Sequence, residues 1–308
     1  MKRFLVRRFG QAVVTIFGVL TLVFFLQRLT GDPVYLLLPD AATQEDIDAL
    51  RHALGFDRPL AVQYLSFIAD FMQLDLGRSV AQKLPVTTIL ASRIPFTLAL
   101  AGGALLVAGG LGLTIGALLG AFHRHPLALP LGWFVVAAQS MPTFWSGILL
   151  ILVFGVGLGW LPPSSSGGPE HLIMPALALG LFSLANFARV TRNSVMEELS
   201  RHYVRTARAR GVPPRRILLR HVARNAAIPV ITVAGLEISN LLAGAVIVET
   251  VFAWPGLGQL TMQSILARDF PIVQGVVLLG AFVTVVLNLA ADILYSVVDP
   301  RIRLQVAR

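Results

Sequence analysis

Six apolar segments, each long enough to cross a lipid bilayer, dominate this 308-residue chain. A transmembrane helix needs about 20 mainly apolar residues, because each residue advances the helix by only ~1.5 Å. The composition agrees: 56% of the residues are hydrophobic and 13% are charged, against about 25% charged in a typical soluble domain. The sequence therefore predicts an all-α membrane protein with six transmembrane helices, at residues 9–29, 97–122, 128–156, 172–192, 226–250 and 274–297.

The placement of basic residues predicts which side of the membrane each loop occupies. With both termini on one side, that side receives 18 of the 25 lysines and arginines, while the opposite side receives the eight acidic residues of the loop 30–96. Cytoplasmic loops of membrane proteins carry the excess of Lys and Arg. Both termini are therefore predicted to be cytoplasmic. The first segment is predicted to be a retained helix, since no A-x-A cleavage site follows it.

The chain divides into four predicted regions: residues 1–29, an external loop at 30–96, a five-helix core at 97–298 and a tail at 299–308. The external loop is too long to be a simple connector. A capping-box pattern at Thr43–Asp46 predicts a short helix with Ile47, Leu50 and Leu54 on one face, and a second helix is predicted over Gln63–Leu74. These helices form either a cap over the helix ends or a docking surface for an external partner.

Several chemistries are excluded by residues that the sequence lacks. It has no cysteine, and its only lysines, Lys2 and Lys83, do not follow a glycine as they would in a phosphate-binding loop. The G-x-S-x-G and H-E-x-x-H motifs are absent as well. We therefore predict no catalytic, cofactor or metal site, and the chain is not expected to be an enzyme.

Glycine and proline mark two features inside the predicted helices. Gly112, Gly116 and Gly120 recur every four residues, a pattern that lets two helix backbones approach closely. Met141-Pro142 interrupts the third segment, because a proline disfavours helical conformation in the residue before it. Such a broken helix either flanks a cavity or is a kink without a functional role.

Five polar residues lie in the fifth and sixth segments, where an ionisable group is costly unless it faces the bundle interior or a water-filled path. Glu237 and Asn240 share one helical face, and they either line a translocation path or bond a neighbouring helix. Glu249, near the external end, either joins the path or faces interfacial water. Asn288 is also assigned to the path, whereas Asp292 is expected to make a structural hydrogen bond.

Residues 203–225 contain seven arginines and no carboxylate, around a Gly-Val-Pro-Pro turn. Gly211 suits a left-handed helix end, so the pattern predicts one helix over Tyr203–Arg210 and another after the two prolines. In the first helix, Tyr203, Val204 and Ala207 form a compact face. The second carries a basic stripe and an apolar one, at Arg216, Arg220 and Arg224 and at Leu218 and Val222.

Two kinds of partner suit so basic a loop. The stripe suits anionic lipid headgroups of the inner leaflet. The first helix, marginal by itself at this length, suits docking into a cytoplasmic protein whose acidic groups meet the arginines. Nucleic acid is not expected as a partner, because a loop between membrane spans has no nucleic-acid-binding fold.

Residues 201–260, which begin RHYVRTARARGVPPRR, resemble the cytoplasmic coupling loop and following helix of bacterial ABC-transporter permeases. The resemblance is greatest to the dipeptide/oligopeptide/nickel family, and within it to the subunit with a long external first loop. Further motifs resemble that family in the same order along the chain: TGDPV (30–34), LGFDRPLAVQYLSF (54–67), LDLGRS (74–79), PFTLAL (95–100), MPTFWSGILL (141–150), LGWLPPSSSGG (158–168), RDFPIVQG (268–275) and NLAADILYSVVDPRIR (288–303).

The resemblance implies an ABC importer type I permease, which forms the translocation path for short peptides or a related small solute in the bacterial inner membrane. Its implied partners are a sister permease in a heterodimer, two cytoplasmic ATPases that hydrolyse ATP, and an external solute-binding protein. Loop 193–225 would hold the coupling helix, with Ala207 and Gly211 allowing close approach to the ATPase. The implied coupling residues are Tyr203, Arg205, Thr206, Ala207, Arg208, Ala209, Arg210 and Gly211.

Some positions depart from the family pattern. The general permease motif begins Glu-Ala-Ala, where this chain has Arg205-Thr206-Ala207, as is common in the peptide branch. His202 stands where many members have an acidic residue, and Arg210 stands where lysine is usual. The alternative function is an ion-coupled secondary transporter without ATPases, which would need mid-membrane carboxylates such as Glu237. Dipeptides, oligopeptides, nickel chelates and glutathione all remain candidate solutes.

Overall fold

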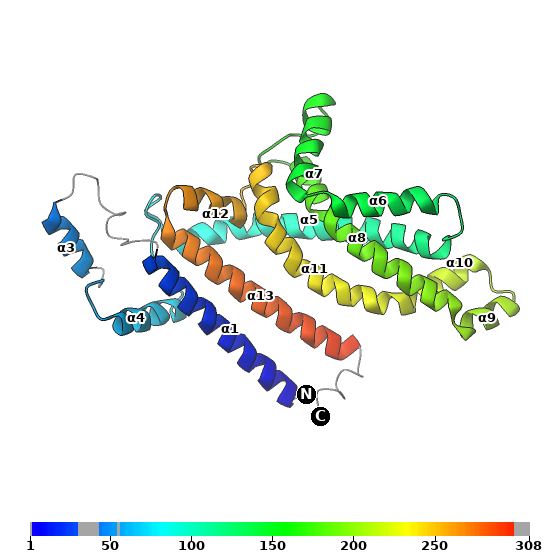
Figure 1. Cartoon of the computed structure of the whole chain (residues 1–308), viewed down its shortest axis with the longest axis horizontal. Helices are drawn as coiled ribbons and strands as arrows, with labels where there is room; N and C mark the ends of the chain where they lie inside the picture. Colours follow the sequence, from blue (N-terminus) through cyan, green and yellow to red (C-terminus); the bar gives the residue numbers. More distant parts are fainter. Residues whose placement is uncertain (1, 30–42, 54–55, 299–308) are drawn as a thin grey trace. The chain divides into compact units, whose positions relative to one another are not determined.

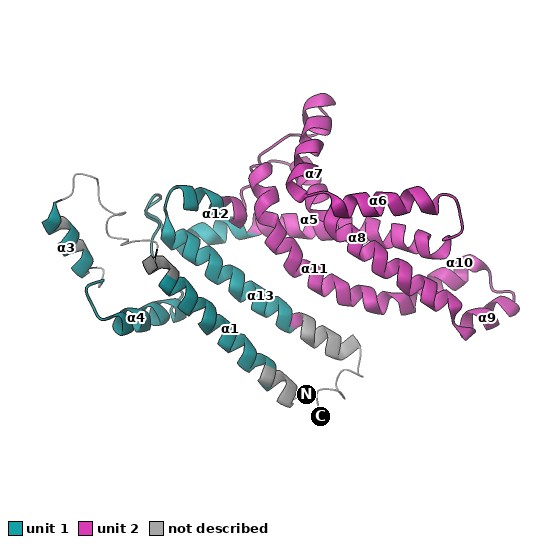
Figure 2. Ribbon diagram, viewed as in Figure 1, with its two compact units in different colours: residues 1–94, 260–289 teal, residues 95–259, 290–308 magenta. Residues whose placement is uncertain are grey.

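The structure, a computed structural model, describes residues 2–29, 43–53 and 56–298 of the chain. Within these ranges the regular structure is helical apart from one isolated β-bridge, between Arg78 and Pro85. The chain forms two compact units, one of residues 1–94 and 260–289 and the other of residues 95–259 and 290–308 (Figure 2). The all-α fold class agrees with the prediction.

Among the described residues, five helical stretches are long and apolar enough to cross a membrane, and a bent pair makes up to six (Figure 1). The single stretches are α1 (Lys2–Leu29), α5 (Val86–Ala121), α8 (Glu170–Ser200), α11 (Ala223–Val251) with the two short elements before it, and α13 (Phe270–Val298). The pair is α6 (Ala128–Ser140) followed by α7 (Thr143–Leu150) and the π-helix η1 (Ile151–Gly157). Large apolar side chains are exposed on each of these stretches, among them Phe17 of α1, Leu106 of α5 and Phe282 of α13.

The bent pair turns through 109° between α6 and α7, at the predicted proline break (Figure 1). Met141 is extended (φ −82°, ψ 124°), and Pro142 precedes the first residue of α7. The Pro142 carbonyl then accepts hydrogen bonds from the amides of Trp145 and Ser146, which starts the new helix. The break follows from the steric restriction that a proline places on the residue before it.

Two predicted boundaries lie elsewhere in the structure. α5 begins at Val86, inside the predicted external loop, and it passes through Pro95 without ending. A proline in a helix removes one backbone hydrogen bond, and the rest of this long helix tolerates that loss. α8 continues to Ser200, so the first eight residues of the predicted cytoplasmic loop 193–225 belong to that helix.

The first unit contains the packing of α1 against α4 (Leu60–Met72), the second helix predicted in the external loop. Phe24 is buried there, with its ring 5.1 Å from that of Tyr64, whose hydroxyl lies 2.7 Å from the Thr21 hydroxyl. The other predicted loop helix is α3 (Gln44–Ala53), in which Ile47 is buried. The side chains of Leu50 and Leu54, predicted on the same face, lie outside the described residues.

The second unit is organised around α8. In its most apolar stretch 61% of the residues are buried, against 17–28% in the corresponding stretches of the other unbroken spans. α6, α7 and α11 pack on it. The predicted ridge of Gly112, Gly116 and Gly120 also faces α8: a Cβ at Gly116 would lie 2.4 Å from the Ala188 carbonyl oxygen. The ridge therefore brings the backbones of α5 and α8 together, as its spacing predicts.

Candidate functional site

The candidate coupling helix, α9 (His202–Ala209), follows α8 after a single residue. That residue, Arg201, has an extended backbone (φ −66°, ψ 150°). At the other end Gly211 has φ +73°; its amide donates to the Arg208 carbonyl (3.0 Å), and the Val212 amide donates to the Ala207 carbonyl (3.1 Å). These paired bonds form a Schellman motif. The predicted helix and its glycine stop are present, with each helix end one residue earlier.

α9 has an inner face that packs on the permease itself. Val204 is fully buried among Val195 of α8, Ile217, Val222 and Ala226, and Ala207 packs against the same cluster. Ala207 is only partly buried, and its small side chain allows α9 to lie close to its own scaffold. The prediction that Ala207 also allows close approach to the ATPase stays a prediction.

The outward face of α9 consists of four exposed residues, His202, Arg205, Thr206 and Ala209. The last three follow His202 by three, four and seven positions, which places all four on one side of a helix. Ala209 is the small residue of this face and Arg205 carries charge, and Arg208 and Arg210 are exposed beside them. The outward face is therefore basic around one small residue.

After the turn, Pro214 occupies the first position of α10 (Pro214–Arg216), where its missing N–H costs nothing. The chain continues as a π-helix, η2 (Ile217–Val222), and then as α11. Because a π-helix bonds residues five apart, the fully buried pair here is Ile217 and Val222, while Leu218 is only partly buried. Arg216, Arg220 and Arg224, the predicted basic stripe, are exposed.

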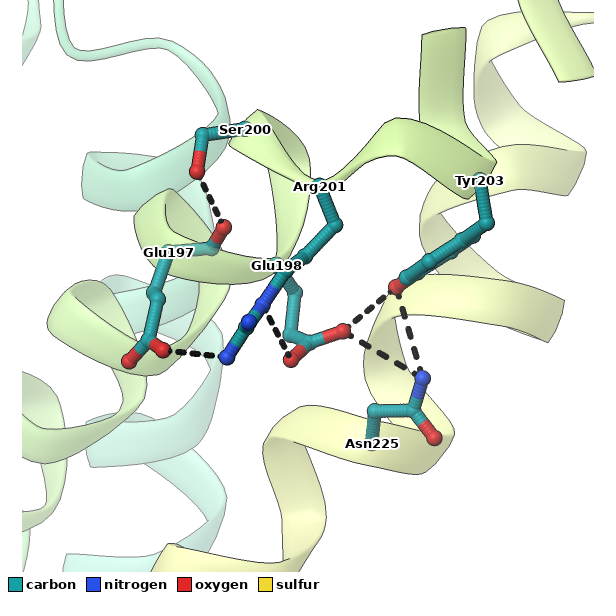
Figure 3. A network of polar contacts seen from close by, with 6 residues as sticks. All are labelled: Glu197, Glu198, Ser200, Arg201, Tyr203 and Asn225. Carbon is teal, nitrogen blue, oxygen red and sulfur yellow. Dashed lines mark hydrogen bonds and ion pairs between the residues drawn. The ribbon is translucent and has the colours of Figure 1, made fainter. Parts of the chain in front are cut away.

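A cluster of polar side chains joins the last turn of α8, the first turn of α9 and the first turn of α11 (Figure 3). The Tyr203 hydroxyl donates to Glu198 Oε2 (2.6 Å), and the Asn225 amide donates to the same oxygen (3.3 Å) and to the Tyr203 hydroxyl (3.4 Å). Arg201 Nη2 contacts Glu197 Oε1 (2.6 Å) and its Nε contacts Glu198 Oε1 (3.7 Å). The pKa of Tyr203 is raised above its usual value near 10.0, mainly by partial burial and to a smaller extent by the hydrogen bond to Glu198.

Glu237, one of the predicted path residues, is buried and bonded to α8. Its Oε2 accepts from the Ser183 hydroxyl (2.5 Å) and its Oε1 from the Asn186 amide (2.9 Å). Asn186 in turn accepts from Arg189 (2.8 Å). Of the two roles left open by the sequence, these contacts favour hydrogen bonding to a neighbouring helix.

Glu249 is completely buried, so the expectation that it faces interfacial water is wrong. Its Oε1 accepts from the Thr97 hydroxyl (2.7 Å), and its Oε2 accepts from the amides of Gly258 (2.6 Å) and Gln259 (3.2 Å). The Thr97 hydroxyl also accepts from the Leu257 amide (2.8 Å). The carboxylate therefore caps the start of α12 (Leu257–Leu266), where the first amides of a helix lack intrahelical partners.

The other predicted path residues, Asn240 and Asn288, are exposed on α11 and α13. They lie in different compact units. The Asp292 side chain lies outside the described ones. No group of three or more metal-ligating residues occurs in the described part of the chain.

Sequence reasoning missed the buried carboxylate of Asp269. It accepts from the Ser79 hydroxyl (2.5 Å) and from the amides of Val80 and Ala81 (both 3.1 Å). Ser79 ends the LDLGRS motif and Asp269 lies in the RDFPIVQG motif, 190 residues later. A lone acid beside an apolar run was the available signal, and it does not identify the partner.

Family models match nearly the whole chain. Residues 112–304 match the binding-protein-dependent transport system inner membrane component, and residues 1–101 match the N-terminal membrane component of such systems. The chain belongs to this family and is a membrane permease subunit of an ABC importer. Such a permease works with a partner permease, ATPase subunits and a substrate-binding protein, and ATP hydrolysis belongs to the ATPases.

The chain is 40% identical over 337 residues to the di/tripeptide transport system permease protein DppB of Pseudomonas aeruginosa, covering 99% of this chain and 100% of that protein. It is 39% identical over 305 residues to the glutathione transport system permease protein GsiC of Escherichia coli K12, covering 98% and 99%. Nothing in these relatives supports the ion-coupled alternative.

Solved structures agree on the fold. An inward-facing structure of the MetNI methionine ABC transporter superposes with a TM-score of 0.60 at 19% identity, over 69% of this chain and 97% of that one. The agreement supports the predicted type I importer permease fold.

Proposed function

We propose that this permease carries short peptides, or a related small solute such as glutathione, into the bacterial cell. The support is the nearly complete match to relatives named for di/tripeptide and glutathione transport. We further propose that it lies in the inner membrane with both termini cytoplasmic, in keeping with the arginine-rich segment 193–225.

The coupling proposal rests chiefly on the outward face of α9, defined above. That face projects from a helix whose inner face is already packed against the permease, so it is free to meet another protein. Its charge calls for an acidic receiving surface on the ATPase. The coupling contact is therefore assigned to the outward face, flanked by Arg208 and Arg210. Tyr203 and Ala207 contact the permease itself, and Gly211 ends the helix.

Asn240 and Asn288 remain proposed path residues, each considered within its own compact unit, because their side chains are exposed. Glu237 and Glu249 are assigned structural roles instead, because both carboxylates are buried and accept several hydrogen bonds from the chain itself. A solute-binding carboxylate would need a free side toward the path.

The coupling face is tested by placing a bulky residue on it. In the assembled transporter, Ala209→Trp should reduce co-purification of the ATPase subunits and abolish ATP-driven uptake, because the new ring stands between two closely docked surfaces. Ala223→Trp, at another exposed alanine near the start of α11, is the matched control and should leave both unchanged. Normal uptake in Ala209→Trp would contradict the assignment.

The substrate is tested in proteoliposomes that contain the complete transporter and its binding protein. Uptake of a labelled dipeptide, tripeptide or glutathione should require ATP, whereas a free amino acid should not be taken up. Uptake driven by an ion gradient, with the permease alone in the membrane, would show that the proposal is wrong.

A further inference from the structure

The joint between α8 and α9 consists of one extended residue, Arg201. A single-residue joint leaves the direction of the following helix undetermined unless side chains hold it. On the inner face of α9, Val204 and Ala207 make apolar packing contacts with the permease. Apolar contacts are non-directional, so they keep α9 close to the scaffold without setting its rotation.

Directional contacts come from the polar cluster, and they converge on one carboxylate (Figure 3). Glu198 lies in the last turn of α8 and receives hydrogen bonds from Tyr203 of α9 and Asn225 of α11. Asn225 also bonds the Tyr203 hydroxyl, so the three side chains close a triangle. The triangle joins the membrane helix that enters the cytoplasmic segment, the short helix within it and the membrane helix that leaves it.

Glu198 differs from its neighbour Glu197 in its surroundings. The Glu198 side chain is 18% exposed, against 67% for Glu197, so water competes less for its hydrogen bonds. The Tyr203 hydroxyl is protonated, and therefore a donor, at neutral pH, because even the usual tyrosine pKa lies near 10. A charged acceptor also makes this hydrogen bond stronger than one between neutral groups.

We infer that Glu198, Tyr203 and Asn225 form a latch that fixes the rotation of α9 against α8 and α11, so that a displacement of α9 moves both membrane helices together. This inference rests on the proposed role of α9 as the coupling helix. The three residues are positioning residues, since the triangle does not include the outward face of α9.

The latch is tested by removing one oxygen atom. Tyr203→Phe keeps the ring but loses the hydroxyl and with it two sides of the triangle, and in the assembled transporter the number of solutes carried per ATP should fall by about threefold or more, as expected for the loss of these hydrogen bonds. ATPase co-purification should be retained, because the outward face of α9 is intact. Tyr64→Phe, which removes a hydroxyl bonded to Thr21 in the other unit, is the control and should not change the ratio.

Asn225→Leu removes the α11 side of the triangle while leaving the Tyr203–Glu198 bond in place. It should lower the same ratio, and the double variant with Tyr203→Phe should be no worse than the more severe single variant, because all three residues act as one unit. Unchanged transport per ATP in both single variants would overturn the latch.

A distance measurement gives a readout independent of transport. The chain has no native cysteine, so spin labels at Arg192→Cys on α8 and Ala209→Cys on α9, both exposed positions, report directly on the joint. Tyr203→Phe should broaden the distance distribution in the detergent-solubilised permease without its ATPases, where the label on the outward face of α9 displaces no partner, and an unchanged distribution would refute the latch. If Ala209→Trp leaves uptake normal, the coupling assignment itself fails, which is a separate result.

Discussion

Gly211 is the residue that ends the candidate coupling helix. Its φ of +73° lies in the left-handed region, which residues with a Cβ disfavour by about 1–2 kcal/mol. A Cβ at this position would meet no atom within 4 Å, so the requirement for glycine is conformational and not steric. The Schellman bonds of Gly211 and Val212 depend on this conformation.

Gly211→Ala should therefore loosen the end of α9 without disturbing the packing around it. We expect the amides of the last turn of α9 to exchange with deuterium about tenfold faster, which corresponds to ~1.4 kcal/mol. Gly102→Ala is the matched control, because its Cβ also meets nothing within 4 Å but its backbone is helical. An unchanged rate of deuterium exchange in Gly211→Ala would mean that the apolar packing of Val204 and Ala207 is enough to keep the last turn of α9 folded.

At the scale of elements, the contact between α5 and α8 depends on the glycine ridge. The Ala188 carbonyl oxygen, the closest atom to a Cβ built at Gly116, belongs to the backbone and cannot rotate away. Gly109, on the same helix, has open space at its Cβ position. The two glycines therefore separate close helix packing from the intrinsic effect of glycine on a helix.

Gly116→Ala should force α5 and α8 apart and lower the thermal midpoint of the detergent-solubilised protein, since overpacking costs about 1–3 kcal/mol. Gly109→Ala should leave the midpoint unchanged or raise it slightly, because alanine favours helix more than glycine does. Equal midpoints for the two variants would show that the helices separate at little cost.

At the scale of the whole molecule, the broken pair α6–α7 decides the topology. If it crosses the membrane, the chain has six spans, and if it re-enters the same side, the chain has five and its termini lie on opposite sides. Both alternatives satisfy the hydrogen bonding of the helices themselves. Charge favours crossing, because it keeps the arginine-rich segment and the basic N-terminus on one side.

Single cysteines introduced into this cysteine-free chain test the topology. A membrane-impermeant maleimide added to spheroplasts should label Ser164→Cys, and should label His123→Cys only after permeabilisation; both positions are exposed. Asp57→Cys, in the external loop, is the positive control. Labelling of His123→Cys and Ser164→Cys from the same side would establish the five-span topology.

The sequence by itself determined the features that depend on neighbouring residues along the chain. Apolar run length set the number of candidate spans, Pro142 set the break in the third, and Gly211 set the end of α9. Each is a local consequence of backbone sterics or of the bilayer thickness. The permease resemblance was readable too, because it rests on motifs in linear order.

Only the tertiary structure decided which side chains meet. Glu249 bonds Thr97, 152 residues away, and Asp269 bonds Ser79 across 190 residues, distances over which sequence spacing carries no information. The direction of Ala207 was also a tertiary outcome. A helical wheel gives the faces of α9, but the element that packs against α9 determines which face is buried. Part of that element is η2, where the wider turn of the π-helix buries Ile217 and Val222 against α9.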